Sequence, residues 1–310
     1  MEIIAGVDEA GRGPLAGPVT AAAVILDEQN PIAGLADSKK LSAKRREILF
    51  DEINNKALSV GIGIVDVNEI DKNNILQATY KAMFKALGSL RPKPNKALID
   101  GFALPNQIIA NEGIIKGDDK IDCIRAASII AKVTRDRIMV KYDIIFPEYG
   151  FAKHKGYGTK DHLAHLNEFK ATPIHRRSFR QVKENLPTIT WLQTNRKIGQ
   201  WGERLAALEY FRNGYKIHAL NHHCAPYGEI DIIVEKDDEI VFVEVKTAAG
   251  KTLGEIEDQV DELKLQRLSD AIDKYLMDNE IEKDIRLDVY AVRLGKNGPI
   301  LKHFKGIELE

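Results

Sequence analysis

Residues 3–13, IIAGVDEAGRG, combine an apolar run, two adjacent carboxylates and a glycine turn. The run at residues 3–8 predicts a strand, with Asp8 and Glu9 at its end. Burying adjacent carboxylates is costly unless cations or hydrogen-bond donors compensate them. The glycines that follow allow the backbone to approach a ligand closely. This stretch therefore predicts a strand that carries acids to a binding site.

Alternating and helical apolar patterns extend along the rest of the chain. In the first half they predict strands at 19–26, 58–65 and 97–100, and helices at 42–57, 75–87 and 121–146. In the second half they predict helices at 198–213 and 256–278, and strands at 215–221, 229–235, 240–246, 286–293 and 300–304. We therefore expect layers of α/β structure.

The length of 310 residues favours two domains, at about 150 residues for each. Periodicity lapses around residues 187–195, so we expect one domain at 1–187, a linker at 188–195 and a smaller domain at 196–310. Hydrophobic residues make up 44% of the chain and charged residues 29%, which excludes bulk disorder.

Targeting and redox features are sparse. No apolar run approaches the roughly 18 residues of a membrane span, and the first residues do not resemble an export signal. The two cysteines, Cys123 and Cys224, cannot form a disulfide framework. We therefore expect a cytoplasmic protein with no membrane partner.

The net charge of −1 hides an uneven distribution. Residues 1–187 carry a net charge of +5 and residues 188–310 a net charge of −6. Within 151–187 there are 8 basic and 3 acidic side chains, interleaved with Tyr157 and Phe179. Such a run is usually a solvated face, but it is also typical of a polyanion-binding surface. We expect His154 and His175 to belong to this surface.

Two further acids follow short apolar stretches next to glycine, Asp100 before Gly101 and Asp118 after Gly117. Taken singly, such acids are usually turn or capping residues. Several in one domain could instead supply oxygen ligands for Mg²⁺ or Mn²⁺. Two such ions roughly 4 Å apart can activate water for phosphodiester cleavage. Metal-dependent phosphoryl transfer is therefore one hypothesis beside plain capping roles.

Residues 1–187 contain a series of motifs, GVDEAGRGPLAGPV (6–19), DSKKLS (37–42), LIDG (98–101), KGD (116–118), AASIIAKVTRD (126–136), YGFAKHKGYGT (149–159) and HRRSF (175–179). Together, and in this order, they resemble bacterial ribonuclease HII. The resemblance implies an RNase H-like mixed-sheet domain. It also implies hydrolysis of the RNA strand of RNA–DNA hybrids, and of single ribonucleotides embedded in duplex DNA. Cleavage would fall on the 5′ side of the ribonucleotide, leaving 3′-hydroxyl and 5′-phosphate ends, with two Mn²⁺ or Mg²⁺ ions.

The resemblance also implies roles for individual residues. The metal-binding and catalytic acids would be Asp8, Glu9, Asp100 and Asp118, with Asp119 leaving a one-residue ambiguity. The turn formed by Gly11, Arg12 and Gly13 would contact the ribose 2′-hydroxyl, which distinguishes RNA from DNA. Tyr157 would stack on the following sugar. The expected phosphate contacts are Lys39, Lys155, Arg176 and Arg177, although Lys39 could merely precede the helix capped by Ser42.

A second group of charged residues lies in the second half. Glu244 and Lys246 are two positions apart on a predicted strand and therefore share a face. A hairpin through 237–238 would place Asp231 beside them. Carboxylates next to a lysine can hold a divalent ion and activate a nucleophile, whereas the simpler reading is a surface hairpin with a cross-strand ion pair.

The second half contains the segments GQWGERLAALEYFRNGYKI, NHHCAPYGEIDIIV, VFVEVKT and RLDVYAV. Through them it resembles the YraN family, UPF0102. It implies a smaller α/β domain with a PD-(D/E)xK nuclease-like core, whose active-site candidates are Asp231, Glu244 and Lys246, with Glu203 as a helper. The segment 247–249 departs from the family by lacking arginine. The alternative for this domain is a non-catalytic docking or nucleic-acid-binding module.

Overall fold

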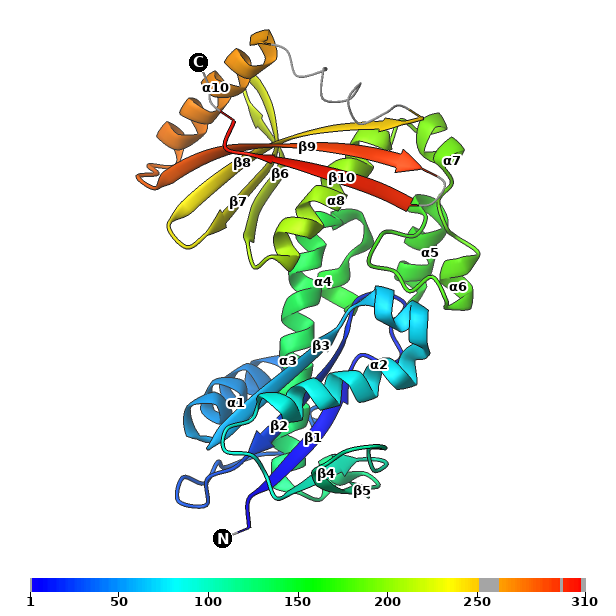
Figure 1. The fold of residues 1–310 in the computed structure, drawn as a ribbon, viewed down its shortest axis with the longest axis vertical. Helices are drawn as coiled ribbons and strands as arrows, with labels where there is room; N and C mark the ends of the chain where they lie inside the picture. The colour runs from blue at the N-terminus through cyan, green and yellow to red at the C-terminus, as the bar shows by residue number, and fades with distance from the viewer. Residues whose placement is uncertain (1, 251–261, 296–297, 308–310) are drawn as a thin grey trace. The chain divides into compact units, whose positions relative to one another are not determined.

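The computed structural model describes residues 2–250, 262–295 and 298–307. The chain divides into two compact units (Figure 1). The first unit holds residues 1–140 and 148–186, and the second holds 141–147 and 187–310. Each unit contains a five-stranded mixed sheet, which confirms the expected α/β fold class. None of the helices in the described ranges has both the length and the apolarity that a membrane span requires.

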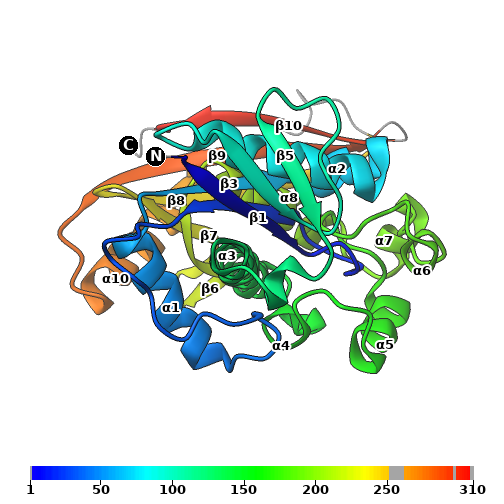
Figure 2. The ribbon, with the colours of Figure 1, turned by 90° about the horizontal axis from the view of Figure 1, so that it is seen from below.

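The sheet of the first unit joins strands from its first 114 residues. Its strands are β1 (Ile4–Ala10), β2 (Val19–Ile25), β3 (Ser59–Val65), β4 (Lys96–Asp100) and β5 (Ala110–Ile114), in the order β3-β2-β1-β4-β5. The pairs β1–β2 and β2–β3 are antiparallel, whereas β1–β4 and β4–β5 are parallel. Because parallel strands end at the same edge, the carboxyl ends of β1 and β4 meet (Figure 2).

Helices cover both faces of this sheet: α2 (Val67–Ser89) packs on one face, and α1 (Ala43–Lys56) and α3 (Asp122–Ile145) pack on the other. The remaining short helices are η1 (Gly117–Asp119), η2 (Pro147–Tyr149), α4 (Phe151–His154), α5 (Lys160–Phe169) and α6 (Arg180–Lys183). One core packs Val7 and its neighbours against α2, and the other packs Ala22 and Val24 against α1 and α3. Asp8 pairs with Ala22 across the sheet, so it lies on the face covered by α3.

The absence of a side chain at Gly6 allows α3 to pack closely against that face. A Cβ atom at Gly6 would lie 2.2 Å from the backbone carbonyl carbon of Cys123, near the start of α3. Because Gly6 and Asp8 are two residues apart on one strand, they face the same way. The close approach brings the beginning of α3 and the preceding η1 turn up to the strand that carries Asp8.

Some elements differ from the prediction. Strand β5 was not expected, because its sequence, ANEGI, lacks apolar alternation. It lies at the edge of the sheet, next to β4. Helix α2 begins at Val67 rather than 75, and Asn74 interrupts it with a φ of 67°. Helices α4 and α6 were also not expected, since each has four residues and is too short to show a periodic pattern. Helix α5 has ten residues and begins after the capping residue Thr159, a signal that the sequence analysis did not use.

The second unit has its own sheet in the order β10-β9-β8-β7-β6. Its elements are α7 (Ile189–Thr194), α8 (Ile198–Arg212), β6 (Lys216–Cys224), β7 (Gly228–Lys236), β8 (Glu239–Ala249), α10 (Glu262–Asp278), β9 (Asp284–Gly295) and β10 (Gly298–Lys305). Residues 256–261 of the predicted helix lie outside the described residues. The segment expected to be a linker contains α7, whose first turn is capped by the Thr188 hydroxyl.

Candidate functional site

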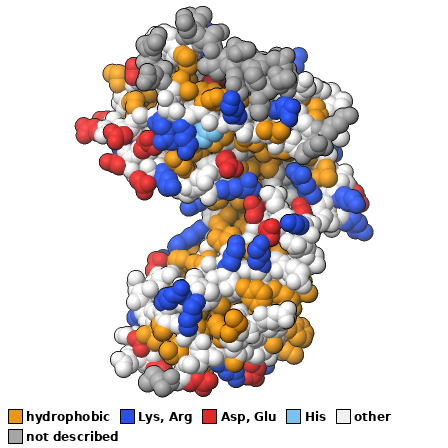
Figure 3. Space-filling view, in the orientation of Figure 1, with side chains coloured by type: hydrophobic (Ala, Val, Ile, Leu, Met, Phe, Trp, Pro, Cys, Tyr) orange, Lys and Arg blue, Asp and Glu red, His pale blue; other side chains and the backbone are white. Residues whose placement is uncertain are grey.

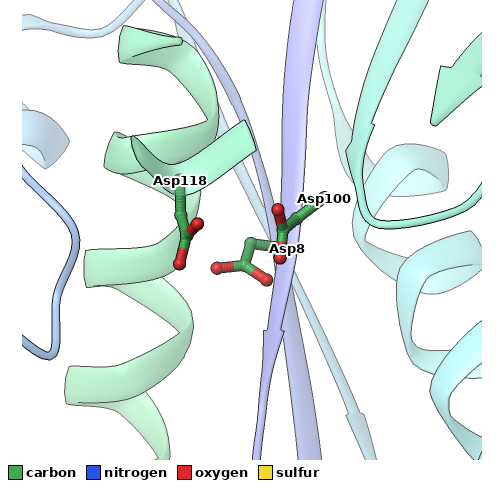
Figure 4. Close-up of side chains that lie close together, drawn as sticks. All are labelled: Asp8, Asp100 and Asp118. Carbon is green, nitrogen blue, oxygen red and sulfur yellow. The ribbon is translucent and has the colours of Figure 1, made fainter. Parts of the chain in front are cut away.

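Three carboxylates from separate parts of the first unit converge at the carboxyl ends of β1 and β4. Asp8 lies on β1, Asp100 is the last residue of β4, and Asp118 lies in η1. One oxygen of each lies within 4.8 Å of those of the other two. Figure 4 shows the three side chains pointing toward one another. Among the described residues, this is the one group of three or more acidic, His or Cys side chains close enough to share a metal ion.

Backbone hydrogen bonds hold the three acids in place. The amide of Glu9 donates to Asp8 Oδ1 at 2.7 Å, and the amide of Gly117 donates to Asp100 Oδ1 at 2.7 Å. Lys116 adopts the left-handed conformation (φ 57°) that starts the η1 turn. The position of Asp118 therefore depends on a turn that is itself anchored to Asp100.

Burial and mutual repulsion disfavour negative charge at this cluster. Burial raises the pKa of Asp8 well above its usual value, and the nearby charges of Glu9 and Asp100 raise it further. Burial and the charge of Asp118 raise the pKa of Asp100 in the same way. Hydrogen bonding to Ser128 acts on Asp8 in the opposite direction. A bound cation would relieve this repulsion, and an all-oxygen donor set suits Mg²⁺ or Mn²⁺.

Glu9, the fourth acid, is not a member of the three-carboxylate group. Its Oε1 lies 3.3 Å from Nη1 of Arg12. Burial raises the pKa of Glu9, the ion pair with Arg12 lowers it, and the charge of Asp100 raises it again. Glu9 is therefore close enough to Asp100 to interact electrostatically.

Lysines flank the cluster. Lys39 Nζ lies 3.3 Å from Asp118 Oδ2, and its side chain remains largely exposed. Lys40 pairs with Asp119, so that Asp119 is engaged away from the three-carboxylate group. The one-residue ambiguity at this motif is resolved in favour of Asp118 as the clustered acid.

The glycine turn is held from inside by Arg176. This side chain is fully buried, and its guanidinium donates to the carbonyl oxygens of Gly11, Arg12 (2.8 Å) and Gly17 (3.1 Å). The prediction that Arg176 contacts phosphate is therefore wrong for this conformation, because its donors are used by backbone and no part of it is accessible. Burial and the charge of Arg135 lower the pKa of Arg176 to about 9.

Tyr157 lies next to the turn. A Cβ atom at Gly13 would be 4.0 Å from Cε1 of Tyr157, whose side chain is partly exposed. Lys155 is left-handed (φ 53°) and bonds through Nζ to the carbonyl of Ala152. Arg177 is exposed, and its backbone amide donates to Asp71 at 3.0 Å. Tyr157 and Arg177 are therefore accessible to a ligand.

Sequence reasoning missed a buried histidine pair. His162 and His175 are fully buried, with their Nε2 atoms 2.9 Å apart. His175 Nδ1 accepts from the amide of Thr172, and His162 Nδ1 lies 2.9 Å from the carbonyl oxygen of Tyr157. His154 is also buried. The expected surface roles of His154 and His175 are therefore wrong, because residue type in a basic run does not reveal which side chains point inward.

The second unit brings its predicted residues together around Glu244. Lys246 Nζ lies 2.8 Å from Glu244 Oε1, which also pairs with Lys264 of α10. Asp231 Oδ2 accepts from the amide of Val245 at 2.7 Å, and burial followed by the charge of Glu244 raises the pKa of Asp231 to about 7. Sequence reasoning missed Lys264, which lies on a different element.

Glu203 lies at the margin of this group. It accepts a 2.9 Å hydrogen bond from Asn221, and burial together with the charges of Glu229 and Glu244 raises its pKa. Glu244 is buried, and among the described contacts its Oε2 has no hydrogen-bond partner. Among the described residues, the ligand atoms of Asp231, Glu244 and Glu203 do not all lie within 4.8 Å of one another.

Comparisons with known proteins divide the chain in the same order. The family model for ribonuclease HII matches residues 5–182, and that of the uncharacterised family UPF0102 matches residues 202–292. A ribonuclease HII from Polaromonas sp. (strain JS666 / ATCC BAA-500) is 59% identical over 184 residues, which are 59% of this chain and 92% of the relative. One from Coxiella burnetii (strain Dugway 5J108-111) is 54% identical over 182 residues, 59% of this chain and 90% of the relative.

A solved structure shows the same likeness. The crystal structure of ribonuclease H2 from Pyrococcus horikoshii OT3 aligns with a TM-score of 0.50 at 29% identity, covering 58% of this chain and 95% of that one. The resemblances to ribonuclease HII and to UPF0102 are thereby confirmed. The chain belongs to the ribonuclease HII family, as a ribonuclease H of type 2 that is followed by a UPF0102 region.

Proposed function

We propose that the first unit cleaves the RNA strand of RNA–DNA hybrids and duplex DNA that contains single ribonucleotides. Cleavage falls on the 5′ side of the ribonucleotide and leaves 3′-hydroxyl and 5′-phosphate ends. The observation that carries this proposal is the convergence of Asp8, Asp100 and Asp118 within 4.8 Å. Such a group can bind divalent cations beside a scissile phosphodiester.

The acids have distinct tasks in this proposal. Asp8, Asp100 and Asp118 hold two Mg²⁺ or Mn²⁺ ions, with Glu9 completing the site from the adjacent position on β1. The ions, when bound, lower the pKa of the attacking water and neutralise charge on the leaving oxygen. Burial of Asp8 excludes bulk water, so that electrostatic interactions at the cluster are strong.

The remaining residues position the nucleic acid. The turn at residues 11–13 reads the ribose 2′-hydroxyl, and the neighbouring Tyr157 ring stacks on the sugar that follows the cleavage junction. Lys39 and Arg177 are exposed and neutralise backbone phosphates. Lys155, which is less exposed, would need to release its bond to Ala152 before it contacts phosphate.

The test compares three duplexes: all DNA, DNA with one ribonucleotide, and an RNA–DNA hybrid, each with EDTA, Mg²⁺ or Mn²⁺. We expect metal-dependent cleavage of the last two only. Asp100→Asn should reduce kcat by at least about 10³-fold while duplex binding persists, because phosphate contacts supply most of the affinity. Asp51→Asn, an exposed acid on α1, is the matched control and should retain activity. Turnover by Asp100→Asn at the rate of that control would refute the proposal.

For the second unit we propose a metal-dependent nuclease site at Asp231, Glu244 and Lys246, with Glu203 as a helper. The observation that favours it is the contact of Lys246 with the buried Glu244, next to Asp231. The alternative is a docking module, which the acidity of this unit favours. Acidic side chains gather at one edge of its surface in Figure 3, and such charge opposes the binding of nucleic acid.

The nuclease and docking hypotheses for the second unit are tested in the full chain carrying Asp100→Asn. This substitution removes the proposed cleavage activity of the first unit. Its products on branched, single-stranded and duplex DNA are compared with those of the same chain carrying Lys246→Ala as well. Metal-dependent cleavage that Lys246→Ala removes supports the nuclease. No cleavage by either chain would leave the docking module.

A further inference from the structure

Two buried arginines hold the glycine turn next to the three-carboxylate group. Arg135 of α3 is 1% exposed and Arg176 is 0% exposed. Arg176 donates to the carbonyl oxygens of Gly11, Arg12, Gly17 and Pro18, and Arg135 donates to those of Ala16, Pro18 and Lys155. A planar guanidinium that binds several carbonyl oxygens fixes their positions relative to one another. The two arginines therefore position the backbone of this loop.

Arg176 sets the orientation of the peptides in the turn. Its guanidinium binds the carbonyl oxygens of Gly11 and Arg12 from inside the protein. The peptides of the turn are trans, so each N–H points away from its carbonyl. The amides of Arg12 and Gly13 must therefore point outward, and within the described residues neither donates to a protein acceptor. They form a pair of preorganised donors on the accessible side of the turn.

Arg135 links the turn to the segment that carries Tyr157. Its Nε donates to the carbonyl of Pro18 and its Nη2 to that of Ala16, both at 3.0 Å, and its Nη1 donates to the carbonyl of Lys155 at 3.0 Å. The ring of Tyr157 lies 5.8 Å from Arg135 Cζ. One side chain therefore fixes the spacing between the outward amides and the stacking ring.

We propose that Arg176, supported by Arg135, is a specificity-determining positioning residue. It holds the amides of Arg12 and Gly13 outward so that they can bind the 2′-hydroxyl of a single ribonucleotide in a duplex. This inference rests on the proposed function of the first unit. It requires the guanidinium fork itself, because a lysine ammonium is a point charge that cannot bind several diverging carbonyls in a fixed plane.

The test measures binding by Asp100→Asn chains, so that the substrate stays intact. The quantity is the ratio of two dissociation constants, that for an all-DNA duplex over that for the same duplex with one ribonucleotide. Two extra hydrogen bonds predict a ratio of roughly ten or more for the parent chain. Adding Arg176→Lys should bring the ratio close to one. Adding Arg177→Ala, the exposed neighbour, should weaken both affinities equally and leave the ratio unchanged.

The outcomes are distinguishable. A parent ratio of one would overturn the reading of the 2′-hydroxyl in the proposed function. A parent preference that survives in Arg176→Lys would overturn the positioning inference alone. A merely structural role would lower the folded fraction and hence both affinities, without changing the ratio. If Arg176→Lys does not fold, Arg135→Lys takes its place, because it loosens the same loop through Ala16 and Pro18, and an unchanged ratio there would also overturn the inference.

Discussion

The amide of Gly117 donates a 2.7 Å hydrogen bond to Asp100 Oδ1, which ties the turn carrying Asp118 to the end of β4. Asp100 is thus both a member of the three-carboxylate group and the anchor of another member. Removing its charge and removing its acceptor are therefore different perturbations.

Asp100→Asn and Asp100→Ala should differ for this reason. Asparagine keeps an oxygen that can accept from Gly117, whereas alanine leaves that amide without its partner. Without metal, we expect Asp100→Ala to be less stable than Asp100→Asn by about 1 kcal/mol. Urea unfolding followed by circular dichroism measures the difference. Equal stability would show that the Gly117 bond does not hold the turn.

Asp8→Asn should make the metal-free protein more stable. The pKa of Asp8 is raised by burial and by its acidic neighbours, so the ionised side chain opposes folding at neutral pH. In EDTA we therefore expect a higher Tm for Asp8→Asn than for the wild type. Saturating Mn²⁺ should stabilise the wild type by about 2.7 kcal/mol at 100 times its Kd, and Asp8→Asn by much less. A larger metal-induced shift in Asp8→Asn would contradict this account.

A pair of glycines tests how closely α2 packs on the sheet. A Cβ atom at Gly63 of β3 would lie 1.9 Å from the carbonyl oxygen of Ala82, whereas one at Gly88 has nothing within 4 Å. We expect Gly63→Ala to destabilise the first unit by about 2 kcal/mol or more, because overpacking displaces the helix. Gly88→Ala should be neutral or stabilising by up to about 1 kcal/mol, because alanine favours the helix.

Fluorescence would not report this comparison, since both tryptophans, Trp191 and Trp201, belong to the second unit. Hydrogen exchange of the β2 and β3 amides provides the readout. Equal protection in the two variants would contradict the packing described for α2.

The sequence predicted the fold where local pattern and packing agree. The run before Asp8 is a strand because its apolar side chains alternate between two helical layers, and this arrangement was predictable. The proximity of Asp118 to Asp8 could be predicted only from the family resemblance. It depends on the left-handed conformation of Lys116 and on the hydrogen bond from the Gly117 amide to Asp100, and local sequence pattern reveals neither. Arg176 was misplaced because charge alone predicts exposure. Its burial depends on carbonyls more than 150 residues earlier in the chain.

The buried histidines predict a dependence of stability on pH. Burial lowers the pKa of His162 to about 4 from a usual value of 6.5. Between pH 6.5 and 4, His162 is therefore protonated in the unfolded chain but neutral in the folded chain. The free energy of unfolding falls as pH decreases through this range. The difference between 6.5 and about 4 corresponds to roughly 3 kcal/mol.

His162→Asn removes this titration while keeping a donor near the Tyr157 carbonyl. The variant should be less stable than the wild type at pH 7, and the difference between their unfolding free energies should shrink by pH 4.5. Asp8 and Asp100 give the free energy of unfolding a pH dependence of the opposite sign. This dependence is the same in both proteins, so it cancels when their unfolding free energies are subtracted. A difference that stays constant across this range would show that His162 does not titrate as described.

Helix α3 contacts the three-carboxylate group through Ser128, which lies next to Asp8. Seven residues later it contacts the loop that contains the glycine turn, through Arg135. Seven residues are about two turns, so both side chains project from one stripe of the helix, roughly 10 Å apart. The helix thus fixes the distance between the three-carboxylate group and the glycine turn. Lengthening or shortening it by a single residue between these points would rotate one end by about 100° relative to the other. Adding a whole turn would keep the direction of both side chains but would move them about 5 Å further apart, so neither kind of length change preserves the spacing.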